Sequence, residues 1–225
     1  MAVLPWLFVL LFVFAIFACL YVVGSTVERF DECTVIERIP TKNGIIEIVN
    51  DECKEGLPHT TDSNTIRMTR AKYTNGNLEK LLVHERVHLD QKRNPEKWLD
   101  FYKRQWDYEV FQESPLPAIY TQRLRPNPDT ALNPWSIWRN RYVFFPYAEE
   151  GTKLGDAVVK VWDIAEHKFV AVPDQWKARF CDVNGCPHQY EHPHEISAEF
   201  LTKRPNSFAA KQVLEWYQKT NKSTM

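Results

Sequence analysis

The segment 77–93, NLEKLLVHERVHLDQKR, places two histidines four residues apart in a helical pattern. Residues with this spacing lie on one face of an α-helix, so His84 and His88 can present two imidazole nitrogens to one ion. Glu85 follows His84 directly, and its carboxylate can turn towards a water molecule on that ion. The sequence therefore predicts a helix that carries part of a metal site.

The residues around this motif favour the helix. Asn77 suits an N-cap, and Asn94-Pro95 ends the pattern after two basic residues. An apolar stripe runs along it through Leu78, Leu81, Leu82 and Leu89. The simpler interpretation is that both histidines are ordinary polar residues of a half-buried helix. Gln91, one turn beyond His88, either orients a ligand or is a solvated helix residue.

A third ligand must come from elsewhere, because a catalytic zinc ion usually takes three protein ligands and one water. The segment 192–201, HPHEISAEFL, offers one. Pro193 suits the first turn of a second helix, and Glu195 lies within that turn. Glu199 lies one turn later and is an alternative ligand or a partner of a ligand histidine. The nearby histidines His188, His192 and His194 are further alternatives.

Together, HERVHLDQ and HPHEISAEF resemble the motifs of the zincin metallopeptidases, and more narrowly of their gluzincin-like branch. The resemblance implies that His84, His88 and Glu195 hold Zn²⁺ and that Glu85 is the general base of peptide-bond hydrolysis. It covers only about a dozen and a half positions. Glu195 lies 107 positions after His88 (195 − 88), which is farther than in compact gluzincins and implies a long insertion at about 114–180.

By this resemblance we expect an α+β fold, with a zincin-like domain over residues 65–225 that contains an active-site helix and a small antiparallel sheet. The resemblance also implies a peptide or protein substrate. The group that stabilises the oxyanion is not identified by a motif. Tyr190, His192 and His194 are candidates because they lie close to Glu195 in the sequence.

Residues 2–23 carry no charge and are long enough for a helix across a bilayer of about 30 Å. We predict an uncleaved, single-pass N-terminal anchor over residues 1–24, so the membrane is an expected partner. Residues 25–64 are then a juxtamembrane segment that enters the domain. A cleaved signal peptide is the alternative, but no Lys or Arg precedes the apolar run, which is also longer than usual for a signal.

Four cysteines outside this span form two pairs that are local in sequence, Cys33 with Cys53 and Cys181 with Cys186. Such pairs favour disulfides and a lumenal or extracellular domain. The basic residues that follow the span weakly favour the cytoplasm instead. For Cys181 and Cys186, free thiols or a structural zinc site with His188 and His192 are alternatives.

Composition narrows the function classes. The chain has 28 basic and 29 acidic side chains and a net charge of −1, so it lacks the basic field that nucleic-acid binding needs. Its 44% hydrophobic and 13% aromatic residues can fill one substantial core. The alternative to an enzyme is a membrane-tethered interaction or structural domain in which the histidine motif is coincidental or holds a structural metal.

Periodicity and turn signals predict the remaining elements. We expect strands at 44–49 and 66–73, a helix from Pro95 to about 112 with an aromatic core face, and a proline-rich loop over 114–134. Short strands at 142–147, 157–162 and 168–172 would form the antiparallel sheet. Two final helices are predicted at 193–202 and, after Ser207, up to about 219.

Overall fold

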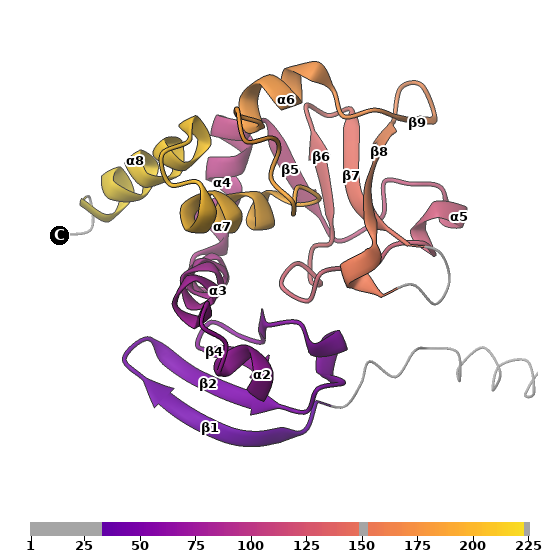
Figure 1. The fold of residues 1–225 in the computed structure, drawn as a ribbon. Helices are drawn as coiled ribbons and strands as arrows, with labels where there is room; N and C mark the ends of the chain where they lie inside the picture. The colour runs from indigo at the N-terminus through magenta and orange to yellow at the C-terminus, as the bar shows by residue number, and fades with distance from the viewer. Residues whose placement is uncertain (1–32, 149–152, 223–225) are drawn as a thin grey trace, which may run out of the picture. The chain divides into compact units, whose positions relative to one another are not determined.

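The computed structural model describes residues 33–148 and 153–222, which form an α+β fold with two sheets and seven α-helices (Figure 1). The predicted anchor and the beginning of the juxtamembrane segment lie outside these residues. Within 33–148 and 153–222, no helix combines the length and the hydropathy that crossing a membrane requires.

The first sheet has the order β1-β2-β4-β3 and is built from β1 (Val35–Thr41), β2 (Gly44–Val49), β3 (His59–Thr60) and β4 (Thr65–Thr69). β2 runs parallel to β4, and the other neighbours are antiparallel. The turn before β2 requires glycine, because a Cβ on Gly44 would lie 2.1 Å from the carbonyl oxygen of Asn64.

The predicted strand 44–49 is confirmed, whereas the strand predicted over 66–73 is only partly right. It ends at Thr69, and the chain continues as the short helix α2 (Arg70–Tyr73). The hydroxyl of Thr69 accepts a hydrogen bond from the backbone N–H of Lys72, which is an N-cap interaction. The strand therefore ends, and the helix begins, at a residue whose side chain caps the helix.

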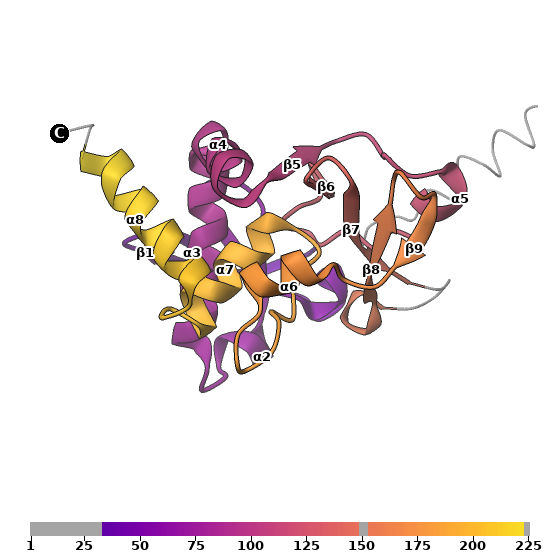
Figure 2. The ribbon, with the colours of Figure 1, turned by 90° about the horizontal axis from the view of Figure 1, so that it is seen from above.

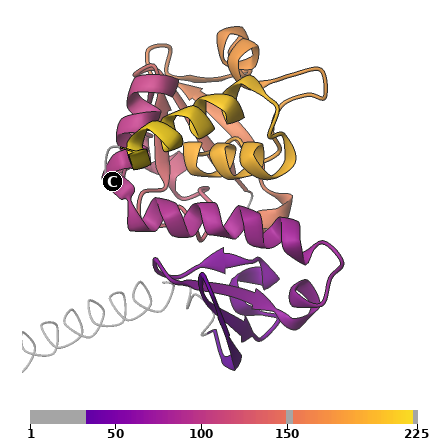
Figure 3. The same cartoon turned by 90° about the vertical axis from the view of Figure 1, so that its left-hand side faces the viewer.

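The motif helix α3 (Leu78–Arg93) lies on this sheet and follows the predicted bounds (Figure 3). Its apolar stripe packs against the sheet: Leu89 is buried in a cluster with Ile46, Ile48, Ile66 and Met68, and Leu78, Leu81 and Leu82 lie at its margin. Asn77 precedes the helix as predicted, but its side chain makes no capping hydrogen bond.

The second sheet has five antiparallel strands in chain order: β5 (Tyr108–Phe111), β6 (Trp135–Trp138), β7 (Tyr142–Tyr147), β8 (Val158–Asp163) and β9 (Lys168–Val170). Its last three strands confirm the predicted antiparallel sheet, although β9 ends two residues early. The first two strands were not predicted. The proline-rich loop contains the single turn of α5 (Ala118–Thr121).

The helix predicted from Pro95 to about 112 is shorter in the structure. Helix α4 (Pro95–Trp106) ends where Asp107 adopts a left-handed conformation with φ 59°. Such a residue closes the helix, and the chain then enters β5. The last turn of the predicted helix is therefore a strand.

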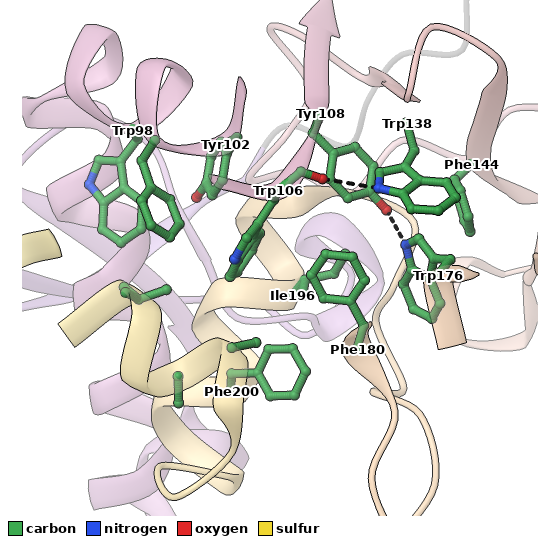
Figure 4. Packing of buried hydrophobic residues seen from close by; sticks show 14 of the residues in the cluster. Trp98, Tyr102, Trp106, Tyr108, Trp138, Phe144, Trp176, Phe180, Ile196 and Phe200 are labelled. Carbon is green, nitrogen blue, oxygen red and sulfur yellow. Dashed lines mark hydrogen bonds between the residues drawn. The ribbon is translucent and has the colours of Figure 1, made fainter. Parts of the chain in front are cut away.

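A large aromatic cluster joins the second sheet to α4, α6 (Asp174–Phe180), α7 (Pro193–Lys203) and α8 (Phe208–Lys222) (Figure 4). Trp138 donates its indole N–H to the carbonyl of Trp106 at 3.0 Å, and Trp176 donates to the hydroxyl of Tyr108 at 2.6 Å. The predicted aromatic core face of α4 is confirmed. Buried indoles with satisfied N–H groups hold the cluster in one arrangement.

Helix α7 contributes Ile196, Ala198 and Phe200 to the buried core, and it packs against both α3 and α8 (Figure 2). The motif helix is thus held between the first sheet and α7. This packing brings a residue of α7 next to the histidines of α3.

Candidate metal centre

The structure brings the three predicted ligands together. His84 and His88 project from α3, and Glu195 projects from the first turn of α7. The Nε2 atoms of the two histidines are 3.1 Å apart. Each lies 3.4 Å from one carboxylate oxygen of Glu195. All three donor atoms lie within 4.8 Å of one another, which is a spacing that one ion can bridge.

The carboxylate oxygens at this site have no hydrogen-bond donor, which favours a bound cation. Both carboxylate oxygens of Glu195 are buried without a hydrogen-bond partner among the described residues, and Glu85 Oε2 is in the same situation. A buried carboxylate without a donor is costly, and such groups are normally paired or bound to a metal. Two nitrogens and one carboxylate are typical ligands of a catalytic zinc ion.

Gln91 sets the tautomer of His88. Its amide nitrogen faces the carbonyl oxygen of His194 at 3.2 Å, which can only accept a hydrogen bond. The amide nitrogen also lies within hydrogen-bond distance of Ser197 Oγ and Tyr102 OH. The amide oxygen of Gln91 must therefore accept, and it lies 2.7 Å from His88 Nδ1. With the proton on Nδ1, a neutral His88 keeps the lone pair of Nε2 free for an ion between His84 and Glu195.

The negative charges around the site favour a positive charge there. Burial by itself would lower the pKa of His88, but the negative charges of Glu195 and Asp129 raise it to about 10. Burial raises the pKa of Glu85 well above its usual value, and the charge of Asp129 adds to the effect. The negative charges that stabilise a protonated His88 would stabilise a metal cation in the same way.

The donor set opens into a cleft of about 710 Å³. His84, Glu85 and Glu195 line it together with Leu57, Pro58, Asn127, Asp129, Pro146, Val159, His188 and Glu191, among others. This volume lies within the range of small-molecule and substrate sites. Burial raises the pKa of the cleft carboxylate Glu191 to about 8, and nearby Glu195 adds to the shift.

The structure gives each of the three oxyanion candidates a contact near the start of α7 or in the aromatic cluster. Tyr190 packs in the aromatic cluster, and the ring of His194 lies 5.4 Å from that of Tyr102. His192 caps α7, accepting at Nδ1 from the backbone N–H of His194. None of the three is among the described residues that line the cleft, whereas His188 is.

In the structure, Glu199 binds backbone N–H groups of the segment before α7. Its carboxylate is fully buried and accepts hydrogen bonds from the backbone N–H groups of His188 and Gln189, each at 3.0 Å. It therefore holds the segment that forms one wall of the cleft. Among the described residues, the grouping of potential metal ligands at the site contains Glu195 and not Glu199.

The four cysteines within residues 33–148 and 153–222 are paired as Cys33–Cys53 and Cys181–Cys186. The second bridge closes the loop just before the cleft wall, and Arg204 donates to the carbonyl oxygens of Gly185 and Cys186 in that loop. The bonded sulfurs leave no thiolate for the alternative zinc site. His59 lies beside the other bridge, whose sulfurs are likewise bonded to each other.

The sequence did not reveal a network in which the part-buried Lys92 meets the buried residues Thr60 and Asp129. Asp129 Oδ1 accepts from the backbone N–H of Thr60 at 2.8 Å and also from its hydroxyl. Lys92 Nζ lies 2.6 Å from the same hydroxyl and 3.4 Å from Asp129. These residues are far apart in the chain and carry no motif, so only the fold shows that they meet.

No protein-family model matches the chain, and neither curated proteins nor solved structures gave a match.

Proposed function

We propose that this chain is a membrane-anchored, zinc-dependent metallopeptidase with a zincin-like domain, and that its domain faces a lumenal or extracellular space. The observation that carries the proposal is the meeting of His84, His88 and Glu195 beside Glu85 at a cleft. Two disulfides are consistent with a non-cytoplasmic domain.

Zn²⁺ bound by these three side chains would supply Lewis-acid activation of a water molecule and of the substrate carbonyl. The protein's part is to fix the donors. Gln91 keeps the lone pair of His88 directed at the site, and burial of Glu195 leaves its oxygens without a competing donor.

Glu85 is the group that handles protons. Its Oε2 is buried, unpartnered and at the cleft, so it can take a proton from water and later give it to the leaving amine. Burial raises the pKa of Glu85, and a cation bound next to it would lower that pKa again towards the range of a general base. A variant that lacks this carboxylate keeps the three zinc ligands but loses the group that transfers the proton.

The first experiment measures zinc by elemental analysis of the purified full chain in detergent. We expect one zinc per chain, lost in the double variant His84→Ala/His88→Ala and strongly weakened in Glu195→Ala. Zinc that survives in the double variant, or no zinc in the wild type, contradicts the proposed centre.

The second experiment compares hydrolysis of an unfolded protein by the wild type and by Glu85→Gln. The variant is nearly isosteric and should keep its zinc, while the rate falls by about 10²- to 10⁴-fold because the general base is gone. A zinc-loaded wild type that cleaves nothing would refute the enzyme.

A further inference from the structure

Potential metal ligands meet at two places in the part of the chain that the structure describes. One is the centre that α3 and α7 form. The other contains Cys33, Cys53 and His59, whose donor atoms also lie within 4.8 Å of one another. The two sulfurs of this second group form a disulfide in the structure. Reduction of that bond would turn the group into two thiols beside an imidazole.

His59 is held in the form that can bind a metal. The residue is buried, with 3% of its surface exposed, and its Nδ1 lies 3.0 Å from the carbonyl oxygen of Leu57. A carbonyl oxygen only accepts hydrogen bonds, so Nδ1 carries the proton and Nε2 keeps a lone pair. Burial lowers the pKa of His59, which favours this neutral form.

A tight turn brings the histidine back to the second cysteine. Lys54, Glu55 and Gly56 have positive φ angles of 46°, 57° and 73° in succession. These left-handed residues form the turn η1 (Cys53–Gly56), and β3 begins at His59 soon after it. The donors of the group therefore come from two ends of one short, sharply bent segment and from the start of the described chain.

Contacts that do not involve the disulfide hold His59 in place. It lies opposite Arg67 in the antiparallel pairing of β3 with β4. The next residue, Thr60, donates its backbone N–H to Asp129 at 2.8 Å. Reduction of the bridge therefore leaves the strand that carries the imidazole anchored on both sides.

Two thiolates and an imidazole are the donors that zinc and other thiophilic divalent ions prefer. Two negative charges balance the charge of the ion, so the filled site is neutral, which suits the buried position of Cys53. Cys33 is only partly buried, so water can reach the ion as a fourth ligand. The other bridge, Cys181–Cys186, belongs to no such group among the described residues.

We propose that Cys33, Cys53 and His59 form a second metal site when a dithiol reduces the Cys33–Cys53 bridge, and that this site binds Zn²⁺ through two thiolates and Nε2. The dithiol supplies two electrons and two protons and leaves as a disulfide, so two cysteine thiols replace the bridge. Zn²⁺ then displaces the two thiol protons. Because either the bridge or the ion links Cys33 to Cys53, this part of the fold is crosslinked in oxidising and in reducing surroundings.

The test uses the full chain in detergent with the first centre removed by His84→Ala/His88→Ala, so its result does not depend on the proposed peptidase. A phosphine reduces the bridges, because a dithiol would compete for zinc, and elemental analysis measures the metal. We expect no zinc in the oxidised double variant and one zinc per chain after reduction. A reduced chain that binds no zinc would overturn the proposal.

Two further changes in the same background identify the ligands. His59→Gln removes the imidazole and should lower zinc affinity by more than about tenfold, since one of three protein ligands is gone. Cys181→Ser/Cys186→Ser is the matched control, which removes the other pair of thiols and should keep the zinc. Circular dichroism establishes that the variants are folded. Zinc that is lost with Cys181 and Cys186 but not with His59 contradicts the assignment.

A second measurement works in the chain with both centres intact. Co²⁺ bound by thiolates gives an ultraviolet charge-transfer band, which the nitrogen and oxygen ligands of the first centre do not give. We expect this band in the cobalt-loaded chain after reduction, and we expect it to be missing in Cys33→Ser/Cys53→Ser. A reduced wild type without the band, or an equal band in that variant, excludes the site.

Discussion

At the scale of single residues, the amide of Gln91 links the two helices of the site. It joins His88 on its own helix to His194 and Ser197 on α7 through hydrogen bonds of 2.7 to 3.2 Å. The same side chain therefore fixes a histidine tautomer and holds one ligand helix against the other. Ligand histidines are commonly oriented in this way by a partner on the second nitrogen.

We predict that Gln91→Met, which keeps the volume and removes the hydrogen bonds, weakens zinc binding by about 10- to 100-fold. The measurement is a zinc titration against a chelator of known affinity. Ser197→Ala is the matched control: it removes one of three groups around the amide nitrogen of Gln91 and should have a much smaller effect. Zinc affinity within about twofold of wild type in Gln91→Met would exclude this role.

Sequence reasoning found the residues of the site that share one helix. His84, Glu85, His88 and Gln91 have a spacing whose geometry is known before folding. Glu195 was named from a second motif. Asp129 was beyond reach, because it belongs to an irregular segment whose position depends on contacts with Thr60 and Lys92, each far away in the chain.

At the scale of elements, α7 carries two carboxylates one turn apart with different tasks. Glu195 faces α3 and the histidines, while Glu199 accepts backbone N–H groups from the segment that walls the cleft. The same residue type on one helix thus belongs to the proposed metal site in one turn and anchors a loop in the next. The sequence pattern E-x-x-x-E cannot assign these tasks, since they depend on which neighbour each turn meets.

We predict that Glu199→Gln destabilises the protein by about 2 kcal/mol, because the amide offers one acceptor and sets an NH₂ group against a backbone N–H. Urea unfolding measures the change. Lys203→Met is the control: Lys203 lies 3.8 Å from the same carboxylate and is half exposed, so its loss should cost less than about 0.5 kcal/mol. Equal costs would show that the ion pair, not the backbone bonds, matters.

The first sheet contains a charged ladder across three strands, in which Glu47 of β2 binds Arg38 of β1 at 2.8 Å and Arg67 of β4 at 2.7 Å. Burial favours the neutral form of Glu47, but the hydrogen bonds from Arg67 and Arg38 outweigh this and lower its pKa. A lowered folded-state pKa adds stability above the unfolded pKa, and this is lost as the pH falls through the folded value.

We therefore expect Glu47→Gln to be less stable than wild type at pH 7, on the order of 1 kcal/mol, and the difference to shrink at acidic pH as Glu47 itself becomes neutral. Urea unfolding at several pH values between neutral and strongly acidic tests this. A difference that is constant with pH would mean that the charge of Glu47 does not contribute.

The secondary-structure elements that were predicted wrongly are those whose conformation depends on a strand far away in the sequence. Residues 107–111 continue the helical pattern of α4, yet Tyr108–Phe111 pairs with Trp135–Trp138, more than twenty residues later. β9 stops at Val170 although the apolar run reaches Val172. Helices are local and can be predicted from spacing, whereas strand ends depend on the partner strand.

At the scale of the whole molecule, the two disulfides constrain very different stretches of chain. Cys33–Cys53 spans 20 positions and Cys181–Cys186 spans 5. Because a crosslink removes more freedom from the unfolded chain when it closes a longer loop, the first bridge should stabilise more.

We predict a loss of about 3 kcal/mol in Cys33→Ala/Cys53→Ala and of about 2 kcal/mol in Cys181→Ala/Cys186→Ala. Each double variant serves as the other's control in urea unfolding under identical conditions. A greater loss from the short loop would show that strain or packing, rather than loop length, sets the order.

The separation of 107 positions between His88 and Glu195 also bears on when the protein becomes competent. During synthesis the two imidazoles emerge first, and two ligands alone make a weak site for the ion. The carboxylate arrives only after the whole five-stranded sheet has been made. The order of the ligands along the chain therefore delays formation of the complete site. The proposed peptidase stays inactive until Glu195 has been synthesised, which is after most of the polypeptide has been translated.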